Sequence, residues 1–292
     1  MHVFVTGGTG LIGRSLVKRL VMRGDEVTVL TRQSLTNEHS VTYITDIDQL
    51  ERVADVVVNL AGEGLAEKRW TERYKQKIRA SRVGLTETLV SHLTKMGAPK
   101  VFLSGSAIGY YGASESEQFS EQAPSGVGFG ANLCVDWEQS ARVLDQQGTR
   151  CVLLRTSVVL DKHVGAYPQM TQSFKFGVAS WMGRGNHWLS WIHLEDMVNG
   201  ILHCMDNDSI SGPVNMTSPQ AISHKSFSDA VSTQKRCFVE MGIPAGLMRL
   251  LLGEMADELL LTGQHVVPTV LSNTGFAFTF PTIEAAITAL ET

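Results

Sequence analysis

The residues with the clearest chemical role lie in a glycine-rich turn between residues 7 and 13, near the N-terminus. The turn follows a short apolar, β-branched run and precedes a helical pattern, so its N–H groups would gather at a helix N-terminus. Such N–H groups bind phosphate, and glycines let a pyrophosphate approach the backbone closely. The GxxGxxG spacing therefore predicts a dinucleotide-binding turn with contacts from Gly7, Gly10, Leu11, Ile12 and Gly13.

Two other interpretations of this turn are open. It could be a tight turn with a structural role only. It could also be a nucleoside-triphosphate loop, because Gly8, Gly13, Arg14 and Ser15 nearly fit GxxxxGK[ST]. That pattern needs a lysine as a compact charge at the β- and γ-phosphates, and arginine is not equivalent to it. No acidic metal ligand ends a hydrophobic strand either, so a triphosphatase is disfavoured.

The end of the second expected strand indicates which dinucleotide is bound. An acidic residue there would accept a hydrogen bond from the ribose 2′-hydroxyl of NAD. The chain has Thr31-Arg32 instead, and a guanidinium pairs with a 2′-phosphate, so NADP(H) is favoured. The alternative is that Arg32 is a solvated surface residue. Asp46, after the third strand, could accept from the adenine amino group or be an ordinary loop residue.

Strand and helix patterns alternate through the first half of the chain, as in a parallel sheet covered on both faces. We predict an α/β fold: a Rossmann-type doubly wound parallel sheet over residues 1–160, to which 190–208 return as a strand and a helix. Residues 161–189 and 209–292 would form a smaller, mostly helical C-terminal cap domain. The expected strands are 3–6, 26–31, 41–45, 53–60, 100–103 and 151–154, and the expected helices are 11–22, 70–96 and 133–144. In the cap, 247–261 would be one amphipathic helix, with possible strands at 266–271 and 276–280.

Composition excludes several classes of protein. The chain has 292 residues, 43% hydrophobic, which is enough for a sizeable core. It holds 25 basic and 29 acidic residues, and this balance is not that of a general nucleic-acid binder. No stretch is typical of a signal peptide or a membrane span. The four cysteines form no CxxC pair, so neither a zinc site nor a disulfide framework is expected, and a cytoplasmic location fits best.

Further motifs resemble those of a known family. Asn59-Leu60-Ala61-Gly62 after the fourth expected strand and Ser104-Gly105-Ser106 after the fifth resemble the extended short-chain dehydrogenase/reductases. The finer match is to the atypical "epimerase family" proteins, related to nucleoside-diphosphate-sugar epimerases. It rests on motifs along nearly the whole chain: Lys68-Arg69-Trp70, Ser81-Arg82, Gly109-Tyr110-Tyr111-Gly112, Asp136-Trp137-Glu138, Leu154-Arg155-Thr156, Trp191-Ile192-His193, Gly212-Pro213-Val214-Asn215 and Gly275-Phe276-Ala277-Phe278.

The resemblance implies a Rossmann domain, a small C-terminal domain and an NADP(H) site. Besides the glycine turn, it implies cofactor contacts from Thr31, Arg32, Leu60, Ala61, Gly62 and Arg82, with Val158 near the nicotinamide. Most family members are named by homology, so the resemblance is a poor guide to the reaction.

The usual catalytic pair of the superfamily is missing. Ordinary members use a serine and a YxxxK pair, in which the lysine lowers the pKa of the tyrosine. None of the five tyrosines here has a lysine four residues later. Counting back from Trp137-Glu138 places Gly130 and Cys134 roughly where tyrosine and lysine belong. A standard epimerase mechanism therefore cannot simply be carried over.

The remaining candidates for chemistry are Ser106, which matches the superfamily serine, and the phenols of Tyr110 and Tyr111. Cys134 could replace the lysine, although burial of a small apolar residue is the more common role. His193 is better interpreted as a structural histidine that joins the two domains. No metal-ligand spacing is present, and the absence of a GxSxG elbow disfavours a serine hydrolase.

Two hypotheses follow. The first is an NADP(H)-dependent oxidoreductase or sugar-nucleotide epimerase that acts on an unknown small-molecule substrate, as a monomer or homodimer. The second is an NADP(H)-binding sensor or regulatory protein without turnover, which would explain the missing pair directly.

Overall fold

A seven-stranded, entirely parallel sheet forms the centre of the computed structural model, which describes all of residues 1–292. The strand order is β12–β7–β5–β4–β1–β2–β3. Apolar runs such as Val3–Val5 and Val56–Val58 are buried on both faces, as expected for such strands. The predicted doubly wound Rossmann-type fold is confirmed. The strands are β1 (His2–Thr6), β2 (Glu26–Leu30), β3 (Val41–Ile44), β4 (Val56–Asn59), β5 (Val101–Ala107), β7 (Arg150–Thr156) and β12 (Gly212–Met216).

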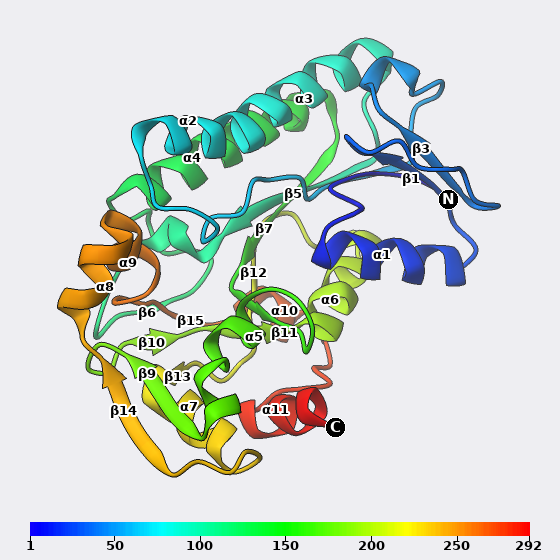
Figure 1. Cartoon of the computed structure of the whole chain (residues 1–292). Coiled ribbons are helices and arrows are strands. Elements are labelled where there is room, and N and C mark those ends of the chain that lie inside the picture. The colour runs from blue at the N-terminus through cyan, green and yellow to red at the C-terminus, as the bar shows by residue number, and fades with distance from the viewer.

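Helices cover both faces of this sheet. Figure 1 shows α2, α3 and α4 along one face and α1 and α6 along the other. The helix predicted over 70–96 begins at Glu72, where the Thr71 hydroxyl accepts a hydrogen bond from the Tyr74 N–H, and it contains a π-helical turn at Ala80–Gly84. The helices are α1 (Leu11–Met22), α2 (Glu72–Arg79), α3 (Leu85–Met96), α4 (Phe129–Arg142) and α6 (Leu194–Asp206), with 3₁₀ turns at Ile47–Gln49 and Val143–Gln147.

The strand order reverses between β1 and β4. The chain proceeds from β1 to β2 and β3 on one side, and from β4 to β5, β7 and β12 on the other. At such a switch point the loops after the two central strands diverge and leave a crevice at the carboxyl ends of the strands. The glycine turn follows β1 and Leu60-Ala61-Gly62 follow β4, so the topology brings the two predicted binding loops together.

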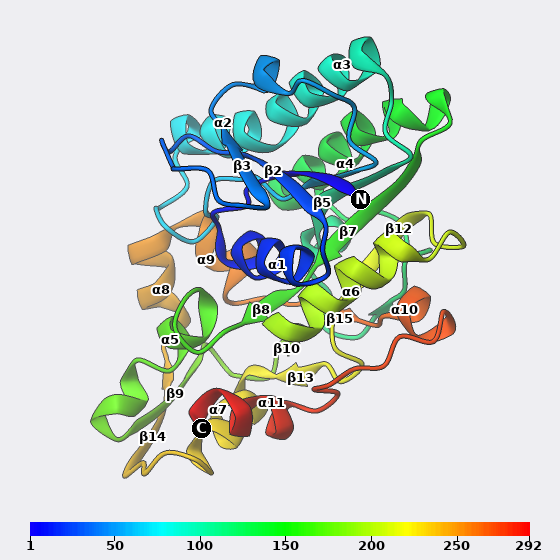
Figure 2. The same ribbon diagram turned by 90° about the vertical axis from the view of Figure 1, so that its right-hand side faces the viewer.

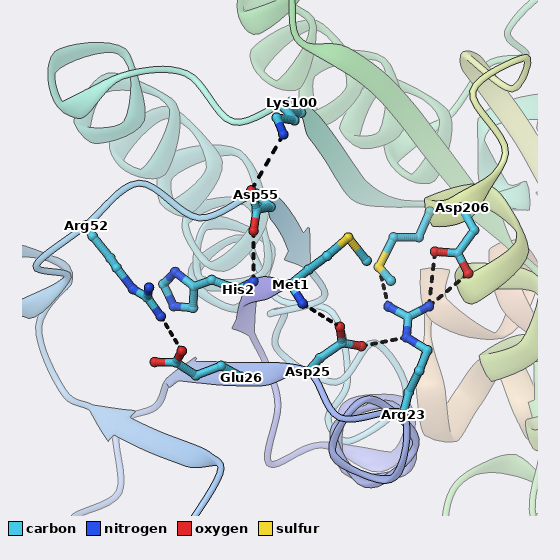
Figure 3. Close-up of polar contacts among 10 residues, drawn as sticks. Met1, His2, Arg23, Asp25, Glu26, Arg52, Asp55, Lys100 and Asp206 are labelled. Carbon is cyan, nitrogen blue, oxygen red and sulfur yellow. Dashed lines mark hydrogen bonds and ion pairs between the residues drawn. The ribbon is translucent and has the colours of Figure 1, made fainter.

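Charged side chains form a cluster at the amino ends of the strands, opposite the binding loops (Figure 3). The Asp25 carboxylate lies 3.0 Å from the amino group of Met1 and 2.6 Å from the Arg23 guanidinium. Arg23 also contacts Asp206 at the end of α6, at 2.8 Å. The cluster therefore joins the first strand to the ends of α1 and α6, at the edge remote from the binding loops.

The second half of the chain forms a smaller unit below the sheet in Figure 2. It has its own core, which includes Leu160, Phe174, Trp191, Phe227 and Ile287. Three strand pairs lie within it: β8 (Val158–Leu160) with β11 (Trp191–His193), β9 (Val178–Met182) with β14 (Val239–Ile243), and β10 (Trp188–Leu189) with β13 (Ile222–Ser223). In a fourth pair, β15 (His265–Val266) lies beside β6 (Gln118–Phe119) of the first half. The six helices are α5 (Ala166–Met170), α7 (His224–Ser232), α8 (Ala245–Leu252), α9 (Glu254–Leu259), α10 (Thr269–Asn273) and α11 (Ile283–Glu291). No helix is both long and apolar enough to span a bilayer.

Three predictions for this half are wrong. The expected strand at 266–271 is strand only at His265–Val266, since Pro268 lacks an N–H and precedes helix α10. The expected strand at 276–280 is irregular chain, because the Asp196 carboxylate accepts the N–H groups of Thr279 and Phe280. The expected helix at 247–261 is divided into α8 and α9 at Gly253, whose φ is +64°.

The boundary between the two units differs from the one that the sequence predicts. Of residues 190–208, strand β11 pairs with β8 outside the central sheet, whereas helix α6 packs on α1. In addition β12, placed in the cap on sequence grounds, is the edge strand of the central sheet beside β7. The sheet therefore extends to Met216, and the exact domain boundaries remain a prediction.

Candidate functional site

The glycine turn leaves no room for side chains. A Cβ on Gly7, whose φ is +71°, would lie 2.7 Å from the carbonyl carbon of Leu60, and one on Gly13 would lie 2.1 Å from the carbonyl oxygen of Gly7. Helix α1 begins directly after the N-cap residue Gly10, with no capping side chain and no acidic residue in its first turn. Its first N–H groups therefore remain available to an anion, which is the fit that a pyrophosphate requires.

A buried hydrogen-bond network fixes the crevice between β1 and β4. The Thr6 hydroxyl donates to the Asn59 side-chain oxygen at 2.6 Å and accepts from the Ala61 N–H at 3.3 Å. The Asn59 amide donates to the Thr86 hydroxyl at 2.8 Å. Leu60 and Ala61 are thereby held against the glycine turn at Gly7.

The end of β2 presents a free guanidinium. Thr31 is buried, whereas Arg32 is exposed and makes no ion pair. Glu63 lies nearby: its hydrogen bond to Lys77 holds its pKa below the usual range, and Arg32 and Lys68 add to that effect. Arg32 therefore lies in a group of charges that includes Lys68, Lys77 and the Glu63 carboxylate. Asp46 caps the 3₁₀ turn that follows, and its contact with the adenine stays a prediction.

Arg82 is a partly buried guanidinium without an acidic partner. It lies against Gly62, where a Cβ would be 3.0 Å from its Cζ, and 5.4 Å from the Trp137 ring centroid. Its one hydrogen bond is a long contact of 3.5 Å to the Ser81 hydroxyl. Burial lowers its pKa, although arginine keeps its charge at neutral pH. An unpaired charge in this position favours an anionic ligand.

A cavity of about 220 Å³ lies at the carboxyl ends of β5 and β7, beneath the second half of the chain. Arg82 and Val158 line it, together with Trp70, Trp137 and Trp188. Twelve of its 23 lining residues are hydrophobic, so it is suited to a ligand with a largely apolar body. A larger hollow of about 660 Å³ lies on the outer side of α3 and α4 and contains none of the predicted residues.

The three predicted catalytic residues lie together, but behind the cavity wall. The Ser106 hydroxyl donates to Glu138 at 2.7 Å, and Glu138 is paired with Arg155 at 2.8 Å. The Tyr111 hydroxyl donates to Asn215 at 2.6 Å and accepts from Arg155 at 3.0 Å.

Tyr110 packs its ring over the Arg155 guanidinium, with 3.5 Å between the guanidinium carbon and the ring centroid. Burial also raises the pKa of the Tyr111 hydroxyl. Residues 107–109 line the cavity, whereas Ser106, Tyr110 and Tyr111 do not. Their catalytic role stays a prediction.

The two other residues weighed for chemistry have structural contacts. The Cys134 thiol donates to the Ala107 carbonyl at 3.6 Å, and burial raises its pKa to about 11, so it is a neutral thiol at physiological pH. His193 caps α6 and packs on Phe280, with ring centroids 3.9 Å apart. His193 thus contacts the C-terminal segment, in line with the structural role expected of it. The structure contains no cluster of metal-ligating side chains.

The sequence did not point to two residues that line the cavity, and both come from the second half of the chain. Glu258 on α9 and His224 at the start of α7 line the cavity. Burial lowers the pKa of His224 to about 3, so its imidazole is neutral at physiological pH. Neither residue lies in a motif, and only the general expectation of a cap above the strand ends pointed to them.

Comparison with known proteins covers both halves of the chain. The model described as "NAD dependent epimerase/dehydratase family" matches residues 3–216, and "Domain of unknown function (DUF1731)" matches residues 243–290. An "Epimerase family protein" of Mycobacterium leprae is 34% identical over 289 residues, which are 98% of this chain and 94% of that protein.

Solved structures show the same likeness. The human epimerase family protein SDR39U1 (isoform 2), solved with NADPH, is 29% identical and has a TM-score of 0.92, with 100% of this chain and 99% of that chain covered. A nucleoside-diphosphate sugar epimerase from Corynebacterium glutamicum is also 29% identical, has a TM-score of 0.81, and is covered over 58% of its length by the whole of this chain.

Proposed function

Because the chain belongs to the NAD dependent epimerase/dehydratase family, we propose that it is an NADP(H)-dependent oxidoreductase for a small molecule. The observation that carries this proposal is the cavity at the carboxyl ends of β5 and β7, which Arg82 and Val158 line beside the binding loops. When bound, NADP(H) would supply the hydride donor or acceptor, and the protein would bind and orient both reactants.

The protein's own residues account for cofactor binding. The N–H groups at the start of α1 would receive the pyrophosphate, and Arg82 would add a positive charge on the cavity side. Arg32 would pair with the 2′-phosphate, which makes NADP(H) the preferred coenzyme over NAD(H). The NADPH in the human relative supports this choice.

The cavity favours a small substrate over a nucleotide sugar. Its volume of about 220 Å³ lies below the range of roughly 300–1,000 Å³ that is typical of drug-sized ligands. The lining is mainly apolar and aromatic, whereas a sugar needs many hydrogen-bond partners. We therefore favour a compact aldehyde, ketone or alcohol with an apolar or aromatic body, and place oxidoreduction ahead of sugar epimerisation.

A second candidate function is an NADP(H)-responsive regulatory protein without turnover. One observation favours it: the hydroxyls of Ser106 and Tyr111, which could otherwise meet a substrate, are engaged in a buried cluster with Glu138, Arg155 and Asn215. Such a protein would bind NADPH tightly and use it to hold its two halves in one arrangement.

Steady-state NADPH oxidation distinguishes the two functions. The purified chain is mixed with NADPH and, in turn, with benzaldehyde, cyclohexanone and a short aliphatic aldehyde. Epimerisation oxidises no NADPH overall, so UDP-glucose and UDP-galactose are incubated separately with the chain and NADP⁺, and their interconversion is followed by chromatography. Turnover of a compact carbonyl, with none of either nucleotide sugar, supports the oxidoreductase. Tight NADPH binding without turnover of any compound, together with a protein partner recovered only in the presence of NADPH, supports the regulatory function instead.

A further inference from the structure

The Glu258 carboxylate lies beside the start of α4, next to Gly130, which is roughly where the sequence places the superfamily tyrosine. It accepts the N–H of Phe129 at 2.9 Å and that of Gly130 at 2.8 Å. A Cβ on Gly130 would lie 3.2 Å from one of its oxygens, and a Cβ on Gly128 would lie 2.9 Å from the other. A side chain at either position would therefore crowd this carboxylate and require it to shift, so Glu258 and the two glycines fit together closely.

Helix α9 holds Glu258 firmly in this place. Met255, one turn earlier on α9, is buried in a cluster with Trp70, Tyr74, Leu133 and Trp137. The carboxylate is therefore positioned by apolar packing on one side and by two backbone donors on the other. Each carboxylate oxygen can accept two hydrogen bonds and receives one from the backbone, so this cavity-lining carboxylate keeps acceptor capacity for a ligand.

The hydroxyl, thiol and indole groups around the cavity have hydrogen-bond partners in the protein. The hydroxyls of Thr156, Ser157, Ser190 and Thr262 each donate to a backbone carbonyl at 2.6–3.1 Å. The Cys134 thiol does the same, and the indole N–H groups of the three cavity tryptophans have protein acceptors.

At neutral pH the His224 imidazole and the Cys134 thiol do not change charge, because burial keeps both neutral. Glu258 is the one carboxyl group that lines the cavity.

We propose that Glu258 is the catalytic residue that exchanges a proton with the substrate in this cavity, in place of the absent tyrosine. This inference rests on the proposed oxidoreductase function. In the oxidising direction the carboxylate takes the proton of the substrate hydroxyl, while the hydride on the same carbon passes to NADP⁺. The products are a carbonyl compound, NADPH and protonated Glu258, which returns its proton to water. Reduction is the reverse, with Glu258 donating its proton to the carbonyl oxygen.

The first test needs no substrate. NADP⁺ carries a positive charge on its nicotinamide ring and NADPH does not, so a nearby carboxylate favours the oxidised form. We expect Glu258→Gln to weaken NADP⁺ relative to NADPH by about three- to tenfold in calorimetric titrations. Glu254→Gln is the matched control: the same change on the same helix, at a residue that pairs with Lys75 outside the cavity. It should leave the ratio of the two dissociation constants unchanged.

The second test uses the compact carbonyl that is reduced fastest in the panel. Glu258→Gln should lower kcat by about 10²–10⁴-fold, the usual contribution of a positioned acid or base, with KM nearly unchanged. Thermal unfolding of both variants shows whether they remain folded. A role limited to capping α4 would lower the unfolding temperature without shifting the coenzyme ratio.

The outcomes separate the two proposals. If the wild type binds both coenzymes and Glu258→Gln keeps the wild-type ratio and kcat, the role of Glu258 is wrong and the proposed function stands. If the wild type binds neither coenzyme, the proposed function is wrong, and so is the proposed role of Glu258.

Discussion

Replacing Gly13 by alanine tests the binding turn most sharply. The added Cβ would lie 2.1 Å from the carbonyl oxygen of Gly7, 2.7 Å from the Cα of Gly8 and 2.8 Å from the carbonyl carbon of Gly7. All three atoms belong to the backbone, so no side chain can rotate away. Since ordinary contacts begin at 3.4 Å, the start of α1 and the turn must separate by roughly 1 Å.

The cost follows from that displacement. Forced backbone shifts of this kind destabilise a protein by about 1–3 kcal/mol. The N–H groups that face the pyrophosphate would also move, and losing one charge-assisted hydrogen bond costs about 1.5–3 kcal/mol, or roughly ten- to a hundredfold in affinity. We therefore expect Gly13→Ala to unfold at a lower urea concentration and to bind NADPH at least about tenfold more weakly.

Gly246→Ala is the matched control. Gly246 lies in α8, and a Cβ there meets nothing within 4 Å, so alanine should raise stability by up to about 1 kcal/mol and leave NADPH binding unchanged. Urea unfolding and calorimetric titration measure both effects on both variants. Wild-type stability and affinity in Gly13→Ala would refute the close approach of the turn to α1.

Three further predictions concern single residues. Arg32→Ala should weaken NADPH about ten- to a hundredfold in calorimetry and hardly change NADH, and equal loss of both would remove Arg32 from coenzyme choice. Glu138→Gln leaves the buried charge of Arg155 unpaired, so urea unfolding should show a loss of about 3–5 kcal/mol; a loss below about 1 kcal/mol would mean that the pair contributes little. Burial lowers the pKa of His224 to about 3, whereas the same side chain protonates near 6.5 in the unfolded chain. The free energy of unfolding should therefore fall as the pH drops below 6.5, and His224→Phe should make this decline shallower. An unchanged pH profile of urea unfolding in the variant would contradict this prediction.

The sequence predicts the fold of the first half well because each signal there is local. The apolar β-branched runs become strands, and the turn between β1 and α1 needs glycines for steric reasons that the spacing already expresses. The errors lie where tertiary contacts decide. The chain at 276–280 has the composition of a strand, but Asp196, which is about eighty residues earlier, takes its N–H groups.

Some residues of the candidate site were predicted from the sequence, and others appear only in the structure. Gly7 and Arg32 follow β1 and β2, and residues that follow parallel strands meet at one edge of the sheet, so the sequence alone predicts both as cofactor contacts. Arg82 lies in a helical turn and was predicted from the family resemblance. Glu258 was missed because its role depends on how a short helix from the far end of the chain packs against α4. In the sequence it is one of several acids in an amphipathic segment. The hydroxyls of Ser106 and Tyr111 matched a motif, yet their partners Glu138, Arg155 and Asn215 appear only in the structure.

Calorimetric titration of the folded wild-type chain with NADPH and, separately, with NADH tests the central claim most directly. We predict that NADPH binds, and that NADH binds at least about tenfold more weakly because it lacks the phosphate that Arg32 would contact. Absence of NADPH binding at millimolar concentrations would contradict the assignment of the glycine turn, Arg32 and Arg82 to this cofactor.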